Sequence, residues 1–240
     1  SNGSNQIWER EFDILMKRTK ARPLPTGEMS VKEAYAVVIF CLVVGTTMLF
    51  LINFYSAILG LLAYISYVFM YTPMKRKSPW AVFVGAIPGA IPPMLGAIAS
   101  TGEFGLIPGV LFFVQFTWQF PHFWAIAWVS FDDYKAGGFS LLPSKTGKSK
   151  NSAFQIVVYS LALIPFSLLP WMLGITGIVS FVFAMVLGLW FFYLSWKLFM
   201  TCDDKDARKL MFASFIYLPI IQFVYVFDAN PEMIKTLLAL

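Results

Sequence analysis

Charged side chains are scarce in this sequence. Asp, Glu, Lys and Arg make up 13% of its 240 residues, whereas a soluble domain carries roughly 25%. Hydrophobic residues reach 58%, which argues against a soluble globular protein. The formal net charge of +5 does not indicate a nucleic-acid partner, because the positions of the basic residues have a simpler explanation, given below.

Cysteine and histidine are also rare, with 2 and 1 residues respectively. Cys41 falls in an apolar run and Cys202 in a polar connection, which excludes a disulfide framework and a thiol-based metal site. Functional groups must therefore be sought among the few carboxylates, the basic residues and the single histidine.

Long apolar runs are abundant. Each is near the length needed to cross a hydrocarbon core of roughly 30 Å at about 1.5 Å per residue. The runs are Val37–Ile52, Ser56–Tyr71, Trp80–Ser100, Leu106–Val129, Phe154–Leu173, Ile178–Met200 and Leu210–Phe227. They predict an all-α, polytopic transmembrane bundle of seven spans that forms one domain over residues 1–240, with the lipid bilayer as its surroundings.

The basic residues are distributed unevenly between the connections. All Lys and Arg residues except Lys235 lie in one alternating set of connections or, for Lys197, in the adjoining turn of a span. This set comprises Ser1–Lys32, Pro73–Pro79, Ser130–Ser152 and Thr201–Lys209. Because short basic connections stay on the inner side, they are predicted to be cytoplasmic, with the C-terminus outside the cell (inner) membrane.

Asn5, Glu9 and Asp13 recur every four residues near the start of the chain. At about 100° per residue, all three side chains project from one helix face, roughly 6 Å apart. Carboxylate and amide oxygens suit Mg²⁺, which usually binds through one or two carboxylates plus substrate phosphates. A solvated helix beside the membrane is the alternative interpretation.

Basic residues follow this acidic face directly. Arg18 and Arg22 belong to a cluster of four cations, and Pro23 biases Arg22 toward an extended conformation, so the helix is predicted to end at Arg22. Carboxylates that hold a metal ion and guanidinium groups that hold the remaining oxygens together fit a diphosphate. The cations Lys75, Arg76 and Lys77 also indicate either phosphate binding or membrane orientation alone.

Two further features lie near the fourth run. Asp132 and Asp133 begin the largest predicted cytoplasmic connection, as a second acidic pair or as ordinary solvated charge. His122 lies about two turns before the end of the fourth span, where a polar side chain needs a partner. His122 is a functional candidate, although a packing role through a hydrogen bond is equally compatible with its position.

Local signals also mark helix starts and packing. Ser30 with Glu33, and Ser152 with Gln155, have the spacing of capping boxes. The third span contains Pro88, Pro92 and Pro93 together with closely spaced glycines. These residues predict either tight helix packing or a kink that lines a cavity.

With both acidic segments in place, the chain resembles the UbiA superfamily of intramembrane prenyltransferases. The first superfamily motif is Asn-Asp-x-x-Asp-x-x-x-Asp; Asn5, Glu9 and Asp13 match it, and Gln6 replaces the second-position Asp. The branch that farnesylates protohaem IX is similar in further segments. These are Asp13–Gly27, Tyr71–Pro73, Gly89–Pro93, Trp118–Phe123 and Asp132–Tyr134, followed by Leu142 and Pro143.

The chain departs from the family in two places. The second motif is usually Asp-x-x-x-Asp, and only Asp132 and Asp133 are acidic here, which leaves open which of them binds metal. Members also have about nine spans, so a chain with seven predicted spans is expected to lack its N-terminal spans.

The resemblance implies a Mg²⁺-dependent prenyltransferase that moves a farnesyl group from farnesyl diphosphate to a vinyl group of haem b, with haem b as substrate and not cofactor. A haem A synthase would act downstream on the product. The implied metal ligands are Glu9, Asp13, Asp132 and Asp133; the substrate-binding residues are Asn5, Arg18, Arg22, Lys75, Arg76 and Lys77; the catalytic residues are Asp13 and His122. The alternatives are a UbiA-type enzyme acting on 4-hydroxybenzoate or a quinone precursor, or a membrane transporter.

Overall fold

The computed structural model describes residues 1–144 and 146–238, with side chains as far as Lys235. These residues form α1 (Asn2–Asp13), α2 (Pro23–Thr26), α3 (Val31–Ile52), α4 (Phe54–Ile65), the π-helix η1 (Ser66–Tyr71), α5 (Thr72–Met74), α6 (Ala81–Thr101), α7 (Leu106–Val129), α8 (Phe131–Ala136), α9 (Lys150–Met172), α10 (Ile178–Thr201), α11 (Asp204–Phe227) and α12 (Pro231–Leu238). The predicted all-α class is confirmed.

Six helical segments of the described residues are long and apolar enough to cross a membrane: α3, Phe54–Met74 (α4, η1 and α5 together), α6, α9, α10 and α11. The remaining predicted span, α7, is a 24-residue helix. It packs against α6, α9 and α11 in the middle of the bundle. Its glutamines and histidine therefore face other helices instead of lipid.

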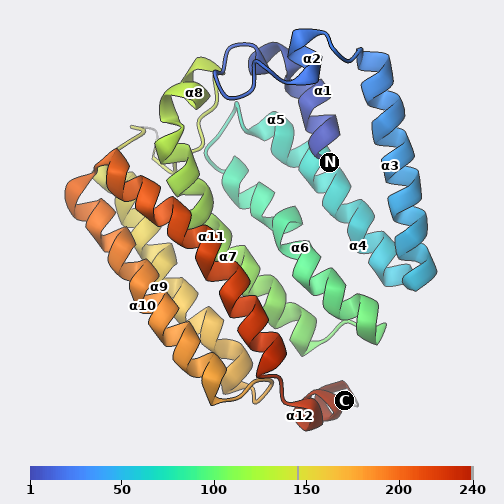
Figure 1. The fold of residues 1–240 in the computed structure, drawn as a ribbon, viewed down its shortest axis with the longest axis vertical. Helices are drawn as coiled ribbons and strands as arrows, with labels where there is room; N and C mark the ends of the chain where they lie inside the picture. Colours follow the sequence, from blue (N-terminus) through green and yellow to red (C-terminus); the bar gives the residue numbers. More distant parts are fainter. Residues whose placement is uncertain (145, 239–240) are drawn as a thin grey trace.

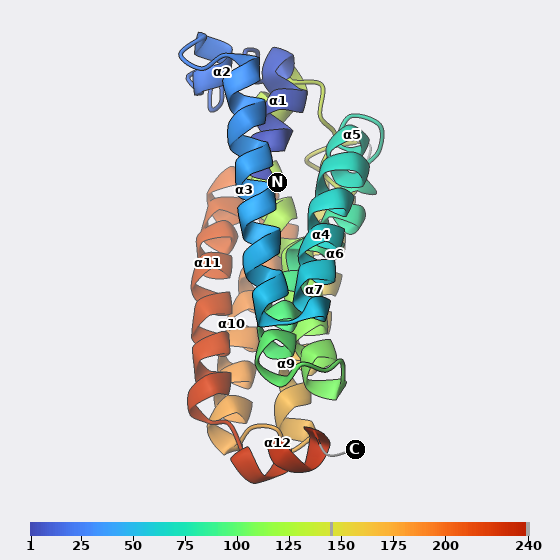
Figure 2. The same cartoon turned by 90° about the vertical axis from the view of Figure 1, so that its right-hand side faces the viewer.

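The long helices run between two ends of an elongated bundle (Figure 1). The short helices α1, α2, α5 and α8 gather at one end, while α12 lies across the other (Figure 2). The predicted basic connections thus meet at the end that carries α1. Every candidate carboxylate of the sequence lies in the segments at this end.

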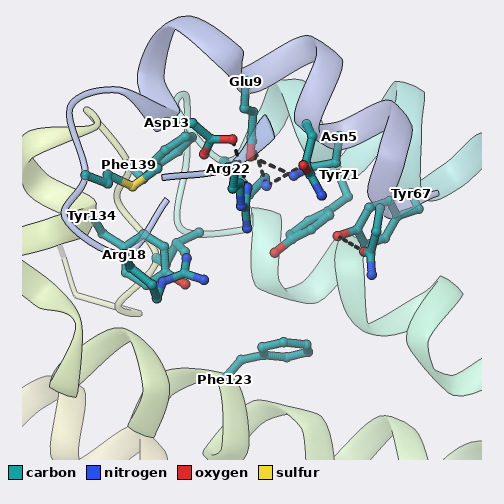
Figure 3. A pocket seen from close by; sticks show the side chains of 15 residues that line it. Asn5, Glu9, Asp13, Arg18, Arg22, Tyr67, Tyr71, Phe123, Tyr134 and Phe139 are labelled. Atoms are coloured by element: carbon teal, nitrogen blue, oxygen red, sulfur yellow. Dashed lines mark hydrogen bonds and ion pairs between the residues drawn. The ribbon is translucent and has the colours of Figure 1, made fainter. Parts of the chain in front are cut away.

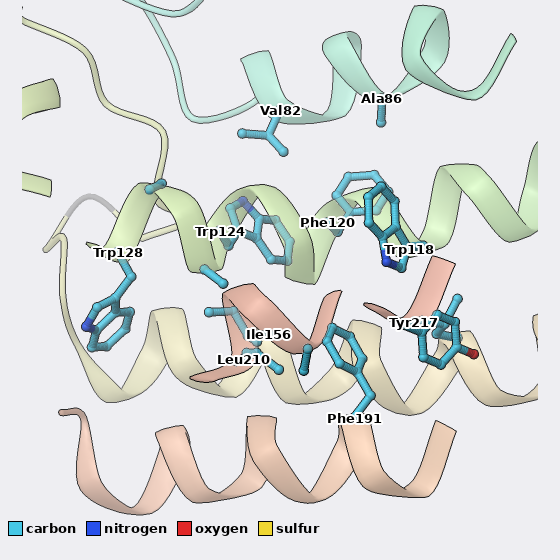
Figure 4. Close-up of a cluster of buried hydrophobic side chains, with 14 of the residues drawn as sticks. Val82, Ala86, Trp118, Phe120, Trp124, Trp128, Ile156, Phe191, Leu210 and Tyr217 are labelled. Atoms are coloured by element: carbon cyan, nitrogen blue, oxygen red, sulfur yellow. The ribbon is translucent and has the colours of Figure 1, made fainter. Parts of the chain in front are cut away.

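The hydrophobic core lies around α7 (Figure 4). Trp118, Phe120, Trp124 and Trp128 project from it and are all buried. Residues of α9, α10 and α11 enclose them, including the fully buried Ile156, Phe191, Leu210 and Tyr217. Buried aromatic side chains contribute large apolar areas to packing, so the contacts with α9 and α11 stabilise the position of α7.

Apolar side chains also cover the outside of the bundle. Only Ala34 of α3 is buried, while Phe40 and Leu51 are 67% and 78% exposed. A soluble protein does not expose contiguous apolar surface on this scale, whereas a bilayer solvates it. The exposed surface agrees with the predicted membrane protein.

The prolines of α6 do not interrupt its helix, which is continuous from Ala81 to Thr101. Gly89 lies so close to α7 that a Cβ atom there would overlap the amide of Gln119. Gln119 is 2% exposed and donates to the Ala86 carbonyl at 2.9 Å. Of the two interpretations left open for this span, close packing through a small residue therefore applies at Gly89.

The two predicted capping boxes have different outcomes. Ser30 and Glu33 form both reciprocal hydrogen bonds at the start of α3, as predicted. The second prediction is wrong, because α9 begins at Lys150 and its N-cap is Ser149, whose hydroxyl accepts from the Ser152 amide. The Ser152 hydroxyl instead donates to the Gly147 carbonyl at 2.7 Å, which removes it from a capping role.

Candidate functional site

The acidic face predicted for the first helix is confirmed. Asn5, Glu9 and Asp13 are 8%, 6% and 0% exposed, so all three point from α1 into the protein. The predicted helix end at Arg22 is wrong, since α1 ends at Asp13. The Asp13 carbonyl accepts from the Thr19 hydroxyl at 2.9 Å, and this bond replaces one that a longer helix would make.

Arg22 nevertheless has the predicted extended backbone, with φ −71° and ψ 154°. The chain turns between Asp13 and Arg22 and brings the guanidinium back to the helix end. Arg22 Nη1 donates to Asp13 Oδ2 at 2.8 Å. The other carboxylate oxygen, Oδ1, is buried and has no hydrogen-bond partner among the described residues. A buried carboxylate oxygen without a partner is a candidate ligand atom.

Glu9 is held by a second set of contacts. Asn5 Nδ2 donates to Glu9 Oε2 at 2.8 Å, and Lys75 Nζ lies 2.6 Å from Glu9 Oε1. Lys75 also donates to Asn5 Oδ1 at 2.8 Å, and the Thr72 hydroxyl donates to the same oxygen at 3.1 Å. The network joins α1 to the end of α5, which follows α4 and η1 along the chain.

The π-helix η1 sets the direction of the residues beside Lys75. Its wider turn places the Thr72 amide and hydroxyl on the same carbonyl, that of Tyr67. Tyr67 and Tyr71 both line the cavity described next, and the Lys75 ammonium lies 5.0 Å from the centre of the Tyr71 ring. Single π-turns of this kind recur at functional sites.

A cavity of about 260 Å³ opens between α1, η1, α7 and the segment after α8. Glu9 and Asp13 lie on one side of it, and Phe123 of α7 lies across the gap (Figure 3). The lining also includes Asn2, Asn5, Gln6, Met16, Arg18, Arg22, Tyr67, Tyr71, Lys75, Tyr134, Phe139 and Leu141. Three cations and two carboxylates thus share one polar cavity, whose excess positive charge suits an anion.

Arg18 contributes a free cation to this cavity. Its guanidinium lies 5.7 Å from the centre of the Tyr134 ring and makes no ion pair with the described residues. Arg76 and Lys77 are exposed and do not line the cavity. Arg76 stacks over Phe12, 3.9 Å from the ring centre. Of the predicted substrate-binding cations, the structure therefore gathers Arg18, Arg22 and Lys75.

The second acidic pair occupies a different position. Asp132 is exposed, and neither it nor Asp133 lines the cavity. The two oxygens of Asp133 accept from the backbone amides of Lys17 and Arg18, each at 3.1 Å. This clamp holds the turn that carries Arg18 against α8. Metal coordination by Asp132 or Asp133 remains a prediction.

The site contains few side chains that could coordinate a metal ion. In the described residues, no group of three or more His, Cys, Asp or Glu side chains is arranged to hold a metal ion. Glu9 and Asp13 supply two carboxylates, and the open Oδ1 of Asp13 is available. Two carboxylates fit Mg²⁺ when substrate phosphates and water complete its coordination. Glu9 and Asp13 therefore fit a metal ion whose other ligands are the phosphate oxygens of a bound substrate.

Burial changes the acid–base behaviour of two lining residues. Desolvation lowers the pKa of the Lys75 ammonium, and the adjacent Glu9 carboxylate opposes part of that shift. Burial also raises the pKa of the Tyr134 hydroxyl, with Arg18 acting in the opposite direction. The Tyr134 hydroxyl is therefore neutral at physiological pH and remains a hydrogen-bond donor.

His122 lies outside this cavity, in the contact between α7 and α11. Its ring stacks on Trp118 with centroids 4.3 Å apart, and Nδ1 lies 2.7 Å from the Ser214 hydroxyl oxygen. Ser214 donates its own proton to the Met211 carbonyl. The Ser214 oxygen then accepts from His122 Nδ1–H, and in the neutral ring this leaves Nε2 unprotonated.

Several of these roles are absent from the sequence prediction. Ser214, Thr72 and Tyr134 have no local signal that separates them from other residues of their type. The sequence predicted that Lys75 binds phosphate. It did not predict the ion pair with Glu9, because that pair depends on how α1 packs against the segment after α5. Thr72 and Tyr134 lie in two of the segments that resemble a known family, Tyr71–Pro73 and Asp132–Tyr134, but the resemblance assigns neither of them a role.

Known proteins resemble this chain over most of its length. The model of the UbiA prenyltransferase family matches residues 1–218. The protoheme IX farnesyltransferase of Cytophaga hutchinsonii is 50% identical over 229 residues, covering 95% of this chain and 80% of that protein. The protein of the same name from Christiangramia forsetii is 49% identical over 234 residues, covering 95% of this chain and 77% of that protein.

A solved structure concerning digeranylgeranylglyceryl phosphate synthase has a similar fold. Its TM-score is 0.77, and the match covers 95% of this chain and 79% of that chain. The two sequences are 21% identical, so the similarity concerns the arrangement of helices alone.

The Asp133 clamp generates a prediction about the turn between α1 and α2. Asp133→Ala should loosen this turn and speed tryptic cleavage after Lys17 and Arg18 by about tenfold, because two hydrogen bonds to a charged group are lost. Cleavage is followed by mass spectrometry on the folded protein in detergent. Asp132→Ala is the matched control, since Asp132 is the exposed neighbour. Equal cleavage of both variants would show that Asp133 does not hold the turn.

Proposed function

Because the chain belongs to the UbiA prenyltransferase family, we propose that it transfers a farnesyl group from farnesyl diphosphate to a vinyl carbon of haem b, which produces haem O. The choice of substrates is supported by the relatives named protoheme IX farnesyltransferase. The single observation that carries the chemistry is the cavity in which Glu9 and Asp13 meet Arg18, Arg22 and Lys75.

The diphosphate would bind among these three cations. Arg22 Nη1 donates to Asp13 Oδ2, and the remaining guanidinium N–H groups of Arg22 are available to donate to phosphate oxygens. Arg18 has no competing ion pair among the described residues. Lys75 donates to Asn5 and contacts Glu9, and a bound phosphate would give this buried ammonium a further anionic partner.

Mg²⁺ would be held by Glu9 and Asp13. When bound, it would neutralise charge on the departing diphosphate, which favours ionisation of the allylic C–O bond. Asp13 would act through Oδ1, the oxygen that lacks a protein partner, while Arg22 keeps the carboxylate in place through Oδ2. Asn5 orients Glu9 in the same way.

The farnesyl chain would leave the cavity along its apolar side. Phe123 of α7 faces the carboxylates across the cavity, Tyr71 lies between them, and Phe139 lies beside Asp13 (Figure 3). Aromatic faces stabilise a neighbouring cation and exclude water from it. A haem vinyl carbon would then attack the cation, which moves the positive charge to the other vinyl carbon. Water would add there and lose a proton to the solvent, which completes the hydroxyethylfarnesyl group.

His122 is proposed as a ligand of the acceptor haem iron. Metal-bound histidine usually donates its second ring N–H to a fixed acceptor, which sets the ring and its tautomer. Ser214 is such an acceptor, and it leaves Nε2 with a free lone pair. This arrangement favours iron binding over a purely structural hydrogen bond.

We also place the cavity at the cytoplasmic face of the inner membrane, with the C-terminus outside. The support is the distribution of basic residues together with their common end of the bundle (Figure 1). Downstream, the hydroxyethylfarnesyl product would be the substrate of a haem A synthase.

The acceptor is tested by membranes that contain the full-length protein and receive labelled farnesyl diphosphate. With haem b we expect a farnesylated haem by chromatography, and with 4-hydroxybenzoate we expect none. Removal of divalent cations should stop product formation, and added Mg²⁺ should restore it. A prenylated benzoate would assign the chain to another acceptor, and no product with either would favour transport.

The metal role of Asp13 is tested in the same assay. Asp13→Asn should lower turnover by at least about 100-fold, the loss seen when a transition-state charge partner is removed. Glu11→Gln is the matched control, because Glu11 lies on α1 with its side chain 73% exposed and should retain wild-type turnover. Similar turnover in the two variants would remove Asp13 from the mechanism.

The haem role of His122 has a spectroscopic test. Ferric haem b added to purified wild-type protein should show the Soret band of a histidine complex. His122→Ala should lose this band, and added imidazole should restore it by replacing the missing ligand. An identical spectrum in wild type and variant would show that His122 does not bind iron.

A further inference from the structure

A second cavity lies on another face of α7. Its volume is about 270 Å³, and it is lined by Pro79, Trp80, Phe83, Phe120, Trp124, Pro143, Gln155 and Tyr159. We call it the α6–α9 groove, because α6 and α9 both pack extensively on α7 but not on each other. None of its lining residues belongs to the diphosphate cavity.

The walls of the α6–α9 groove are aromatic and mutually packed. The Phe120 and Tyr159 rings lie 4.4 Å apart, centre to centre, and Trp124 meets Tyr159 edge-on at 5.1 Å. Phe83 of α6 lies 5.8 Å from Phe120. Rings that support one another in this way keep the groove open without a ligand, as preformed ligand sites do.

Trp124 has an unused hydrogen-bond donor here. Its side chain lies within the core but Nε1 has no partner among the described residues, and the residue is 5% exposed. The other buried tryptophans of α7 are both satisfied: Trp118 donates to the Ser214 carbonyl, and Trp128 donates to Asp204. Figure 4 shows the Trp124 indole nitrogen on the edge of the ring nearer α6.

Two further polar groups line the groove without a partner. The Tyr159 hydroxyl and the Gln155 amide make no hydrogen bond with the described residues, and no charged side chain belongs to the lining. A buried N–H is usually satisfied by protein, water or ligand. The groove therefore suits a neutral acceptor oxygen attached to an apolar body.

The exposed residue at the edge of the groove indicates which surroundings supply such a molecule. Trp80, which lines the groove, is 67% exposed. It directly precedes α6, at the end of the bundle that carries α1 and α8 (Figure 1). Tryptophan is enriched at the depth where the hydrocarbon meets the headgroups, and lipid ester carbonyls lie at that depth. The groove thus opens to the bilayer at the level of neutral carbonyl acceptors.

We propose that the α6–α9 groove binds one acyl chain of a diacyl membrane lipid, whose ester carbonyl accepts a hydrogen bond from Trp124 Nε1. The bound lipid supports α7 on the side away from the diphosphate cavity. Phe123, which lines that cavity, directly precedes Trp124, so an occupied groove fixes the segment that carries both. This inference is independent of prenyl transfer.

The test compares two lipids with identical headgroups and chain lengths, a diester phosphatidylcholine and its diether analogue, which lacks the carbonyls. Each is titrated into the delipidated protein in detergent, and bound lipid is counted by native mass spectrometry. Wild-type protein should bind the diester about tenfold more tightly, the value of one buried hydrogen bond. Trp124→Phe keeps an aromatic ring but loses the indole N–H donor, so it should bind both lipids equally.

Trp190→Phe is the matched control, because Trp190 lies 37% exposed on α10 and outside the groove. It should keep the tenfold preference. Equal binding of the two lipids by wild-type protein would overturn the proposal without any variant. The same conclusion would follow from a preference that survives Trp124→Phe, or from the absence of saturable lipid binding.

Discussion

The ion pair between Glu9 and Lys75 holds the functional end of this protein together. The two charged groups lie 2.6 Å apart, and both are largely buried. Charges removed from water are tolerated only when they are paired and hydrogen-bonded, and Asn5 supplies the additional bonds. The pair ties α1 to the segment after η1, and without that attachment one wall of the diphosphate cavity would have no fixed position.

The acidic side chains fall into two groups according to what their oxygens contact. Asp133 uses both oxygens on backbone amides and so stabilises a turn. Asp13 uses one oxygen on Arg22 and leaves the other buried without a partner among the described residues. An unsatisfied buried oxygen has a free-energy cost that a bound cation would remove. This difference makes Asp13 the stronger candidate for metal binding.

Much of this organisation can be predicted from periodicity. The spacing of Asn5, Glu9 and Asp13 correctly places them on one face, and apolar run lengths correctly predict the long helices. Predictions failed where a side chain offered the backbone another partner. Where α1 ends, the Asp13 carbonyl accepts from the Thr19 hydroxyl, and the Lys17 amide donates to Asp133. At the start of α9, the Ser149 hydroxyl is the cap in place of Ser152. Such local competition leaves no periodic signal.

The sequence alone determined the membrane class, the common end of the basic connections and the identity of the first acidic motif, because each depends on composition or on spacing along one helix. Only the tertiary structure decided which cation meets which carboxylate, that His122 pairs with Ser214, and that Trp124 keeps an unpaired donor. These contacts join residues far apart in the chain. Their geometry depends on how the helices pack, and spacing within one segment carries no information about that packing.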